Sequence, residues 1–520
     1  MPDRILIIDF GSQYAQIIAR RVRDLEVFCE LLPWNAPRDL LLTDATKGVI
    51  LSGGPNSVYA PNAPKIPEFI LDSGLPILGI CYGMQALTHA LGGVVSPSDH
   101  HEYGQTQIEV LVENKLLAEP EMTVLMSHGD RITQPPPGWQ VIARSDNSPV
   151  AAMADFTNQR FGLQFHPEVH HTPQGIEILK HFVLEICKCH PDWTSDSIIQ
   201  EAISRIQTQV GDGHVLSAVS GGVDSSVATA LVQRAVGDRV ECVFINTGLM
   251  RKDETSQVEA VFRPMLGNHL HMIDSSERFL ESLKGVTDPE QKRKIVGETF
   301  IREFERVSAQ FGDAEFLCQG TIYSDVVESL GIGTKTGRLI KSHHNVGGLP
   351  KDVRFKLVEP LRMLFKDEVR HVGEALGLPR ELVWRQPFPG PGLAVRVLGE
   401  VTPKRVRTLQ EADAVFVDEL SKANLLTISE NEAGESVGSS QAFAVLLPIK
   451  SVGVMGDQRT YAETICLRAI TTDDFMTADW SRLPYNVLAR ISSRIVNEVE
   501  GVNRVVYDIT TKPPATIEWE

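Results

Sequence analysis

The sequence predicts an α/β protein in which two doubly wound parallel-sheet domains are followed by a small α+β C-terminal domain. The chain has 520 residues, too many for one hydrophobic core, so two to four domains are expected. In the first three quarters of the chain, short apolar runs alternate with helix-length segments, as in parallel sheets with right-handed crossovers. The last quarter combines strand-length runs with one amphipathic helix.

The first predicted domain covers residues 1–193. Its strand candidates are the apolar runs at residues 5–8, 48–51, 76–80, 123–126 and 161–165. The segment HPDWTSD then breaks the pattern, which places the boundary near Trp193. Ser197 and Gln200 have the spacing of a capping box, so we expect a new helix to open there.

The second predicted domain covers residues 194–395. Its strand candidates are residues 215–219, 240–246, 269–273 and 316–319, with helix-length segments between them. The run PFPGPG at 387–392 cannot continue a helix, and we place the second boundary just after it.

The third predicted domain covers residues 396–520. Strands are expected at 442–454, 463–470 and 504–509, and a helix at 486–499. Apolar side chains recur along this helix at helical spacing, which predicts one buried face, formed by Val487, Leu488, Ile491, Ile495 and Val499.

Composition narrows the functional classes. The formal net charge of −17 disfavours a nucleic-acid surface, because phosphate contacts are made mainly by clustered Lys and Arg. Seven cysteines form no paired framework, and Cys187 and Cys189 have C-x-C spacing instead of the C-x2-C of zinc ribbons. The opening apolar run is too short for a signal peptide, and no membrane-length apolar stretch follows. We therefore expect a cytoplasmic protein without nucleic-acid or membrane partners.

A first chemical constellation surrounds Cys81. The segment GICYG lies between an apolar strand and an amphipathic helix, the layout of a nucleophile elbow with Cys in place of Ser. Pro167 favours an extended His166, so His166 and Glu168 face the same side as a base and its orienting carboxylate. Backbone N–H groups of Gly54 and Tyr82 are candidates for the oxyanion site. Taken singly, each residue is also compatible with a purely structural role.

Three segments of this region carry a family resemblance. GICYGMQ (79–85), SGGP (52–55) and FHPE (165–168) resemble the signatures of class I glutamine amidotransferases over roughly the first 190 residues. That family hydrolyses glutamine through a thioester and releases ammonia. The resemblance implies that Cys81 is the nucleophile, His166 the base and Glu168 its partner.

A second constellation follows the strand at 215–219 and opens a helix. Glycines let backbone N–H groups approach phosphate oxygens, and serines add hydroxyl donors. The loop lacks the Lys and the spacing of a Walker A motif, and SGGVDSS instead resembles N-type ATP pyrophosphatases, which cleave ATP between the α and β phosphates. A ligand-free helix cap is the alternative. The predicted ATP-binding residues are Ser220, Gly221, Gly222, Val223, Asp224, Ser225 and Ser226, with Lys366 facing the departing pyrophosphate.

The segment 331–350 is long, polar and rich in glycine. Such a loop is as compatible with a surface excursion as with an active-site lid. Its adjacent His343 and His344 point apart if extended, so no metal site is predicted there.

Further segments extend the resemblance to the glutamine-hydrolysing GMP synthase family: GTIYSDVVES (320–329), KSHHNVGGLP (341–350), RQPFPGPGLAVR (385–396), SVGVMGDQRTY (451–461) and KPPATIEWE (512–520). This family adenylates XMP with ATP and Mg2+, and ammonia from glutamine then displaces AMP. The resemblance implies a homodimer formed by the third domain. It offers Arg293, Lys512 and Glu518 for XMP contact, although Arg293 is equally compatible with a solvated helix charge. The stretch 421–440 departs from the family pattern and leaves its local fold open.

Two other functions remain as alternatives. A glutaminase with a nucleotide-sensing ATP domain would release ammonia whether or not XMP is present. A sulfur transferase acting on tRNA is disfavoured by the negative charge and by the absence of a second catalytic Cys candidate near SGGVDSS.

Overall fold

The computed structural model describes residues 2–12, 14–312, 314–329, 355–430, 436–455, 458–472, 475 and 477–520. The chain divides into two compact units. The amino-terminal unit comprises Met1–Ile198 and Ser324–Ile340, and the carboxy-terminal unit comprises Ile199–Tyr323 and Lys341–Glu520.

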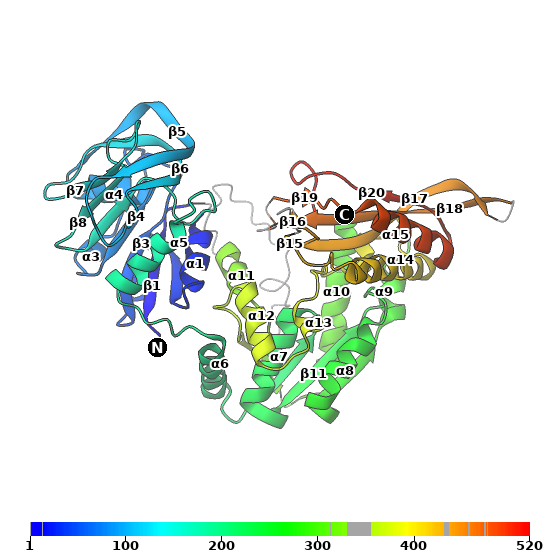
Figure 1. The fold of residues 1–520 in the computed structure, drawn as a ribbon. Coiled ribbons are helices and arrows are strands. Elements are labelled where there is room, and N and C mark those ends of the chain that lie inside the picture. Colours follow the sequence, from blue (N-terminus) through cyan, green and yellow to red (C-terminus); the bar gives the residue numbers. More distant parts are fainter. Residues whose placement is uncertain are drawn as a thin grey trace. The chain divides into compact units, whose positions relative to one another are not determined.

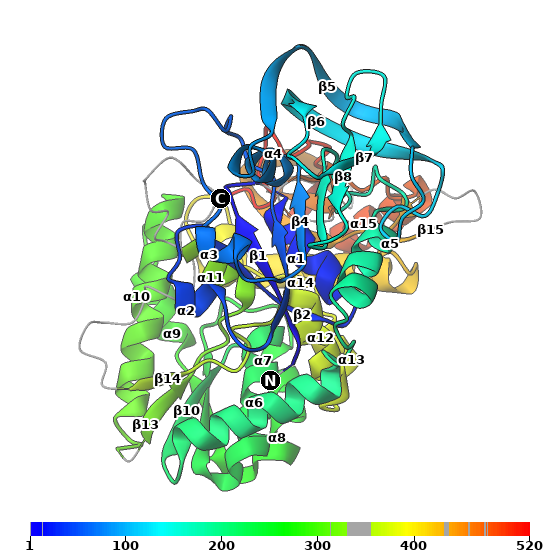
Figure 2. The same ribbon diagram turned by 90° about the vertical axis from the view of Figure 1, so that its left-hand side faces the viewer.

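The amino-terminal unit is built on a nine-stranded sheet (Figure 1). Five strands run parallel, in the order β2 (Phe28–Pro33), β1 (Arg4–Asp9), β3 (Thr46–Leu51), β4 (Ile77–Ile80) and β9 (Arg160–Leu163). The sheet continues with antiparallel strands β8 (Ala152–Asp155), β7 (Gln140–Arg144), β5 (Val94–Val110) and β6 (Glu121–Gln134). The β5 and β6 strands form a long ribbon (Figure 2). Four of the five expected runs thus lie in parallel strands, and the fifth, at 123–126, lies in the antiparallel β6.

Helices pack against the parallel half of this sheet. They are α1 (Ala15–Arg23), α2 (Arg38–Leu41), α3 (Glu68–Leu71), α4 (Tyr82–Ala90), α5 (Gly175–Lys180) and the π-helical η1 (His181–Ile186). β1 is apolar except at its two ends and buried throughout, as expected for a parallel strand covered on both faces.

The carboxy-terminal unit contains a second, fully parallel sheet. Its order is β12 (Leu270–Asp274), β11 (Val240–Asn246), β10 (His214–Val219), β13 (Ala314–Cys318) and β14 (Lys356–Val358). The associated helices are α7 (Val223–Val236), η2 (Gly237–Arg239), α8 (Glu254–Leu266), η3 (Gly267–His269), α9 (Ser276–Ser282), α10 (Pro289–Ser308), α12 (Lys366–Ala375) and α13 (Arg380–Val383). Helices α6 (Ser195–Val210) and α11 (Tyr323–Ser329) span the points where the chain passes between the units.

The predicted helix opening at Ser197 is displaced by one turn. Helix α6 begins at Ser195, and Thr194 caps it: Ser197 N donates to Thr194 Oγ1 at 3.4 Å, while Thr194 N donates to Ser197 Oγ at 2.9 Å. Ser197 therefore occupies the third helical position of a capping box and does not open the helix.

The end of the carboxy-terminal unit carries a smaller sheet. Strands β17 (Gln441–Met455), β18 (Gln458–Thr471) and β19 (Asp479–Trp480) are antiparallel, and β20 (Val502–Tyr507) lies parallel to β18. β15 (Ser429–Glu430) and β16 (Ser436–Val437) form a two-stranded sheet within the stretch whose fold the sequence left open. Residues 431–435 of that stretch lie outside the described part of the chain.

Two helices cover this sheet, and the sequence predicted only one. In α15 (Tyr485–Glu498), Val487, Ile491 and Ile495 are buried as expected, Leu488 is half-buried, and Val499 is buried just beyond the helix. The missed helix is α14 (Pro403–Lys422). Its start carries a recognisable signal, because Thr402 Oγ1 accepts from Arg405 N at 3.3 Å and proline occupies the first helical position.

One hydrophobic core runs through the carboxy-terminal unit. It joins Leu216 and Val243 of the parallel sheet to Leu409 of α14 and Leu467 of β18. It also includes the 3-10 helix η4 (Gly392–Val395), where the sequence placed a domain boundary. The two predicted domains on either side of residue 395 thus share apolar packing.

Candidate active sites

Cys81 occupies a tight turn between β4 and α4. Its φ of 51° lies in the left-handed region, which is unusual for a residue other than glycine. The neighbouring glycines are required by space: a Cβ on Gly83 would lie 2.3 Å from Leu51 O, and one on Gly79 would lie 2.7 Å from Met84 N. The turn has the geometry of a nucleophile elbow.

His166 and Glu168 lie beside this turn, on the loop that follows β9. Glu168 Oε1 is 2.7 Å from His166 Nδ1, and the two side chains are 0% and 4% exposed. Cys81 is close enough to the same imidazole to raise the pKa of His166. The three predicted side chains, which follow two different strands, therefore come together in the order thiol, imidazole and carboxylate.

The electrostatics favour a protonated His166. Burial alone would lower the pKa of His166, but the Glu168 charge, the hydrogen bonds with Cys81 and Glu168 and the Cys81 charge raise it well above its ordinary value of 6.5. The imidazole therefore carries a proton at neutral pH. This is the state needed to protonate a leaving ammonia.

The predicted oxyanion residues are neighbours. A Cβ on Gly54 would lie 3.2 Å from Tyr82 Cγ and 3.0 Å from Phe10 O, so the Gly54 backbone packs directly on the Tyr82 ring. Gly53 is similarly close to His166, with its hypothetical Cβ 3.3 Å from the imidazole Cε1. The SGGP loop therefore lines the same site as the triad.

Sequence reasoning missed Asp9, which accepts a hydrogen bond from Ser52 Oγ of this loop at 3.4 Å. Asp9 Oδ1 accepts from Gly11 N at 2.8 Å and from Ser12 N at 3.2 Å, while Ser52 Oγ accepts from Phe10 N at 3.0 Å. Burial raises the pKa of Asp9, and the hydrogen bonds from Gly11, Ser12 and Ser52 oppose that shift. The signal in the sequence was Asp9 at the end of an apolar run, with Gly11 and Ser12 two and three residues further on.

A second buried histidine network lies on the β5–β6 ribbon. His128 Nε2 is 3.3 Å from Glu102 Oε2, which also accepts from Ser148 Oγ at 2.8 Å, and Glu102 Oε1 accepts from Ser145 Oγ at 3.1 Å. Next to His128, the Ser127 carbonyl accepts from Cys81 Sγ at 3.6 Å. No sequence spacing could reveal this network, because strand pairing assembles it from distant segments.

The predicted phosphate loop connects β10 to α7. Gly221 has a φ of +76°, and Ser225 Oγ accepts from Ser220 N at 3.1 Å. Ser226 Oγ donates to Gly222 O at 2.7 Å. The glycine-rich backbone of this turn lies at the N-terminus of α7, a helix of 14 residues, where backbone N–H groups can bind phosphate.

Two other predicted segments meet this loop. Lys366 Nζ is 2.5 Å from Asp224 Oδ2, so the lysine expected to face pyrophosphate pairs with the loop's own carboxylate. A Cβ on Gly320 would lie 3.0 Å from the Asp224 carbonyl carbon, which places the GTIYSDVVES segment against the loop. Among the described residues, Asp224 Oδ1, Gln319 Oε1 and Thr321 Oγ1 are buried without a hydrogen-bond partner. Three oxygen atoms on neighbouring segments are thus unsatisfied.

The residues expected to contact XMP are held by other groups in the carboxy-terminal unit. Arg293 donates to Glu520 O at 2.5 Å, and Lys512 Nζ donates to Phe475 O at 2.7 Å. Glu518 accepts two hydrogen bonds from Arg396, at 2.8 and 3.1 Å. Arg396 has no exposed surface. These three residues make no hydrogen bond or ion pair with one another among the contacts of the described chain.

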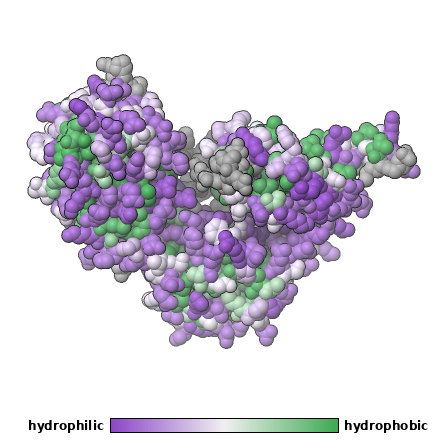
Figure 3. Space-filling model, in the orientation of Figure 1, coloured by the Kyte–Doolittle hydropathy of each residue, from purple (hydrophilic) through white to green (hydrophobic). Residues whose placement is uncertain are grey.

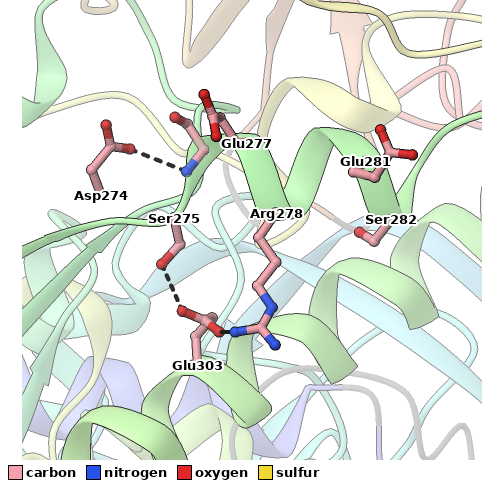
Figure 4. A pocket seen from close by; sticks show the side chains of 8 residues that line it. Asp274, Ser275, Glu277, Arg278, Glu281, Ser282 and Glu303 are labelled. Atoms are coloured by element: carbon pink, nitrogen blue, oxygen red, sulfur yellow. Dashed lines mark hydrogen bonds and ion pairs between the residues drawn. The ribbon is translucent and has the colours of Figure 1, made fainter.

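A pocket of about 720 Å³ lies where β12 ends and α9 begins (Figure 4). Its walls carry four carboxylates, from Asp274, Glu277, Glu281 and Glu303, and Arg278 is paired with Glu303. Such a surface repels phosphate, and none of the predicted site residues lines the pocket.

Some expectations fall on residues that the structure does not describe. These are the segment 331–350 with His343 and His344, and residues 456–457 of the segment SVGVMGDQRTY. Within the described chain, no group of three His, Cys, Asp or Glu side chains is arranged to hold a metal ion. All seven cysteines are buried and free of disulfides. None of the described helices has the length and apolar character needed to span a membrane.

Comparisons with known proteins cover the whole chain. The model of the class-I glutamine amidotransferase family matches residues 6–186, and the model of the GMP synthase C-terminal domain matches residues 428–519. A GMP synthase [glutamine-hydrolyzing] from Carboxydothermus hydrogenoformans is 54% identical, with 100% of each chain covered. The protein of the same name from Thermomicrobium roseum is also 54% identical, over 100% of this chain and 97% of its own.

A solved glutamine amidotransferase structure from Thermotoga maritima aligns with 46% of this chain and 99% of its own, at 22% identity and a TM-score of 0.28. The full-length identity with the two curated relatives, together with the two family models, shows the membership: this chain belongs to the glutamine-hydrolysing GMP synthase family.

Proposed function

We propose that this chain makes GMP from XMP, with glutamine as nitrogen donor and ATP as the activating nucleotide. Family membership supports the overall reaction of a carbon–nitrogen ligase. The observation that carries the residue assignment is the buried Cys81, His166 and Glu168 arrangement at a strained turn.

In the glutaminase step, Cys81 attacks the side-chain carbonyl carbon of glutamine as a thiolate beside the protonated His166. The oxyanion that forms faces the backbone N–H groups of Gly54 and Tyr82. The protonated His166 gives its proton to the departing ammonia, and a thioester remains. Water then attacks the thioester with His166 as base, and glutamate leaves. Glu168 orients the imidazole and stabilises its positive form.

In the ATP step, the phosphate loop positions the triphosphate. The C2 oxygen of XMP attacks the α-phosphorus, the bond to the β-phosphate oxygen breaks, and pyrophosphate leaves. Ammonia then attacks C2, and AMP departs with the oxygen, which yields GMP. The loop's backbone N–H groups bind the phosphates. Lys366 exchanges its partner Asp224 for the departing pyrophosphate.

The unsatisfied oxygens beside the loop fit a magnesium ion that enters with ATP. Asp224 Oδ1 is a hard oxygen donor without a hydrogen-bond partner within the described residues, and Mg2+ binds through one or two carboxylates plus substrate phosphates. When bound, the ion would neutralise charge on the phosphates. Asp224 is the residue we assign to hold it.

XMP contacts are assigned to the C-terminal tail. Glu518 is the strongest candidate, because Arg396 fixes its carboxylate from a fully buried position. Lys512 and Arg293 supply positive charge for the XMP phosphate once they release the backbone carbonyls that they hold here. All three assignments come from the resemblance, and Arg293 lies on α10 and not in the tail.

A homodimer in the cytoplasm completes the proposal. The arm formed by β17 and β18 exposes Ile449, Val452, Val454 and Tyr461, each at least half exposed. Hydrophobic residues are visible on this arm in Figure 3. Exposed apolar groups concentrated on one hairpin are typical of a protein interface, and a second copy of the same arm would bury them. Sedimentation of the wild type and of Val454→Asp tests this assignment.

Pyrophosphate and GMP formation with ATP, magnesium and XMP test the proposed reaction. Glutamine and ammonium chloride are compared as nitrogen sources, for the wild type and Cys81→Ala. We expect the wild type to use both sources and the variant to use only ammonium. Glutamine hydrolysis that ignores XMP, without GMP from either source, would support the glutaminase with a nucleotide-sensing domain.

A further inference from the structure

A buried ion pair lies under the phosphate loop. Arg385 Nη2 is 2.7 Å from Glu254 Oε1, and the two side chains are 17% and 4% exposed. The other arm of the same guanidinium, Nη1, donates to the carbonyl oxygen of Gly221. One arginine thus bridges a helix-terminal carboxylate and the backbone of the loop.

The pair is packed directly against Gly221. A Cβ built on Gly221 would lie 3.1 Å from Glu254 Oε1 and 3.4 Å from Arg385 Nη1. Glu254 is itself held at the start of α8, because its second carboxylate oxygen accepts from Arg251 N at 3.1 Å. The carboxylate is therefore fixed before it pairs with the arginine.

The consequence for the loop follows from the planarity of the peptide. The carbonyl oxygen of Gly221 and the N–H of Gly222 belong to one trans peptide unit and point in opposite directions. A guanidinium that holds the oxygen on one side therefore aims the Gly222 N–H at the other. On that side it meets Ser220 Oγ at 3.3 Å, within the proposed phosphate cradle.

Because residue 221 is glycine, the orientation of the Gly221–Gly222 peptide has to be fixed by a neighbouring group. With a φ of +76°, Gly221 occupies a backbone region that only glycine adopts freely, and glycine has many alternative conformations. Rotation of this one peptide would turn a phosphate donor away from the ligand. A bidentate arginine suppresses that rotation, because its planar fork matches two acceptors at fixed spacing.

We propose that Glu254 and Arg385 form a positioning pair that orients the Gly221–Gly222 peptide for ATP, an inference that rests on the proposed ATP-binding role of the loop. Arg385 acts through Gly221 and does not need to touch the nucleotide. The residue thereby extends the site beyond the SGGVDSS motif, into the segment that precedes PFPGPG.

Calorimetric titration of the full chain with ATP and magnesium, without XMP, tests the pair. The variants are Arg385→Gln, Glu254→Gln and Arg385→Lys. The matched control is Lys252→Gln, which breaks an ion pair only two residues from Glu254, with Glu411 at 2.6 Å and both side chains 42% exposed. Thermal unfolding of each variant separates a binding defect from a folding defect.

We expect Arg385→Gln and Glu254→Gln to weaken ATP binding by about tenfold to a hundredfold, as for loss of a charge-assisted hydrogen bond at a buried site. Lys252→Gln should bind as the wild type does. Arg385→Lys should remain weak, since one ammonium group cannot span both acceptors in the fork geometry.

Wild-type affinity in Arg385→Gln or Glu254→Gln would overturn the proposal. Wild-type affinity in Arg385→Lys would also overturn it, because charge without the fork would then suffice. An equal loss in Lys252→Gln would point to general charge removal instead. Failure of the wild type to form pyrophosphate with XMP counts against the proposed function alone, because ATP affinity is measured separately.

Discussion

Replacement of Glu168 by glutamine isolates the contribution of one buried negative charge to the glutaminase. The side chain keeps its shape, but its hydrogen bond to His166 Nδ1, 2.7 Å long, no longer involves a carboxylate. A hydrogen bond to a charged group contributes about 1.5–3 kcal/mol. At about 1.4 kcal/mol per pKa unit, the pKa of His166 should fall by roughly one to two units. Glutamine-dependent GMP formation should fall about 10- to 150-fold.

The raised pKa of His166 determines the direction in which Glu168→Gln shifts the pH profile of the glutaminase. The folded-state pKa of His166 is raised above the ordinary 6.5, so the stabilisation from its partners is complete below 6.5 and is lost as pH rises through the folded value. Glu168→Gln lowers that folded value. The alkaline limb of the glutaminase profile, which reports loss of the His166 proton, should therefore move to lower pH.

The assay measures glutamate release and GMP formation across a pH series, with glutamine or ammonium as the nitrogen source. Glu177→Gln is the control, since Glu177 is exposed and pairs with Lys180 on α5. Ammonium-dependent GMP formation should be unchanged in both variants. A Glu168→Gln profile that overlies the wild type, or an equal loss of the ammonium-dependent rate, would refute the assigned role.

Three further predictions concern packing, pH and helix capping. Gly83→Ala places a methyl group 2.3 Å from Leu51 O, so it should lower the free energy of unfolding by about 1–3 kcal/mol and abolish glutamine use; Gly297→Ala, in open space within α10, should be neutral or stabilising by about 0.5–1 kcal/mol. Burial by itself raises the pKa of Glu102, but hydrogen bonds from its neighbours lower it overall. The stabilisation of the fold by the Glu102 carboxylate is therefore present above pH 4.5 and is lost as pH falls through the folded pKa. The difference in thermal unfolding between wild type and Glu102→Gln should be largest near neutrality and vanish in acid. Asp288→Ala removes the side-chain cap of α10 and should cost about 1 kcal/mol in chemical denaturation, and no loss would show that the cap is dispensable.

Much of the parallel architecture was predictable because its strands are continuous apolar runs. β11 (Val240–Asn246) matches the predicted range at both ends, and β1 and β10 differ by a residue or so. The antiparallel half of the first sheet was mostly missed. β5 is mostly polar and β8 has only four residues, so neither contains the apolar run that marks a parallel strand.

Helix α14 shows a different limit. Twenty residues with a Thr cap and a proline at the first turn were read as part of an unassigned segment. Its start carries the local signals of a helix, a Thr402 cap and Pro403 at the first helical position. The displaced start of α6 has another origin. Thr194 and Ser197 are both residues that can cap a helix, and only the observed hydrogen bonds identify Thr194 as the cap.

The sequence by itself determined the chemistry that each motif can perform. An elbow cysteine, an FHPE segment and an SGGVDSS loop are local patterns whose residue types and spacings carry their own chemical meaning. Only the tertiary structure decided which distant groups support them. Asp9 under the SGGP loop, Glu102 beside His128 and Arg385 beneath Gly221 are brought to their partners by strand pairing and core packing. Contacts between residues far apart in the chain leave no regular spacing, and their energies depend on burial that exists only once the sheets have formed.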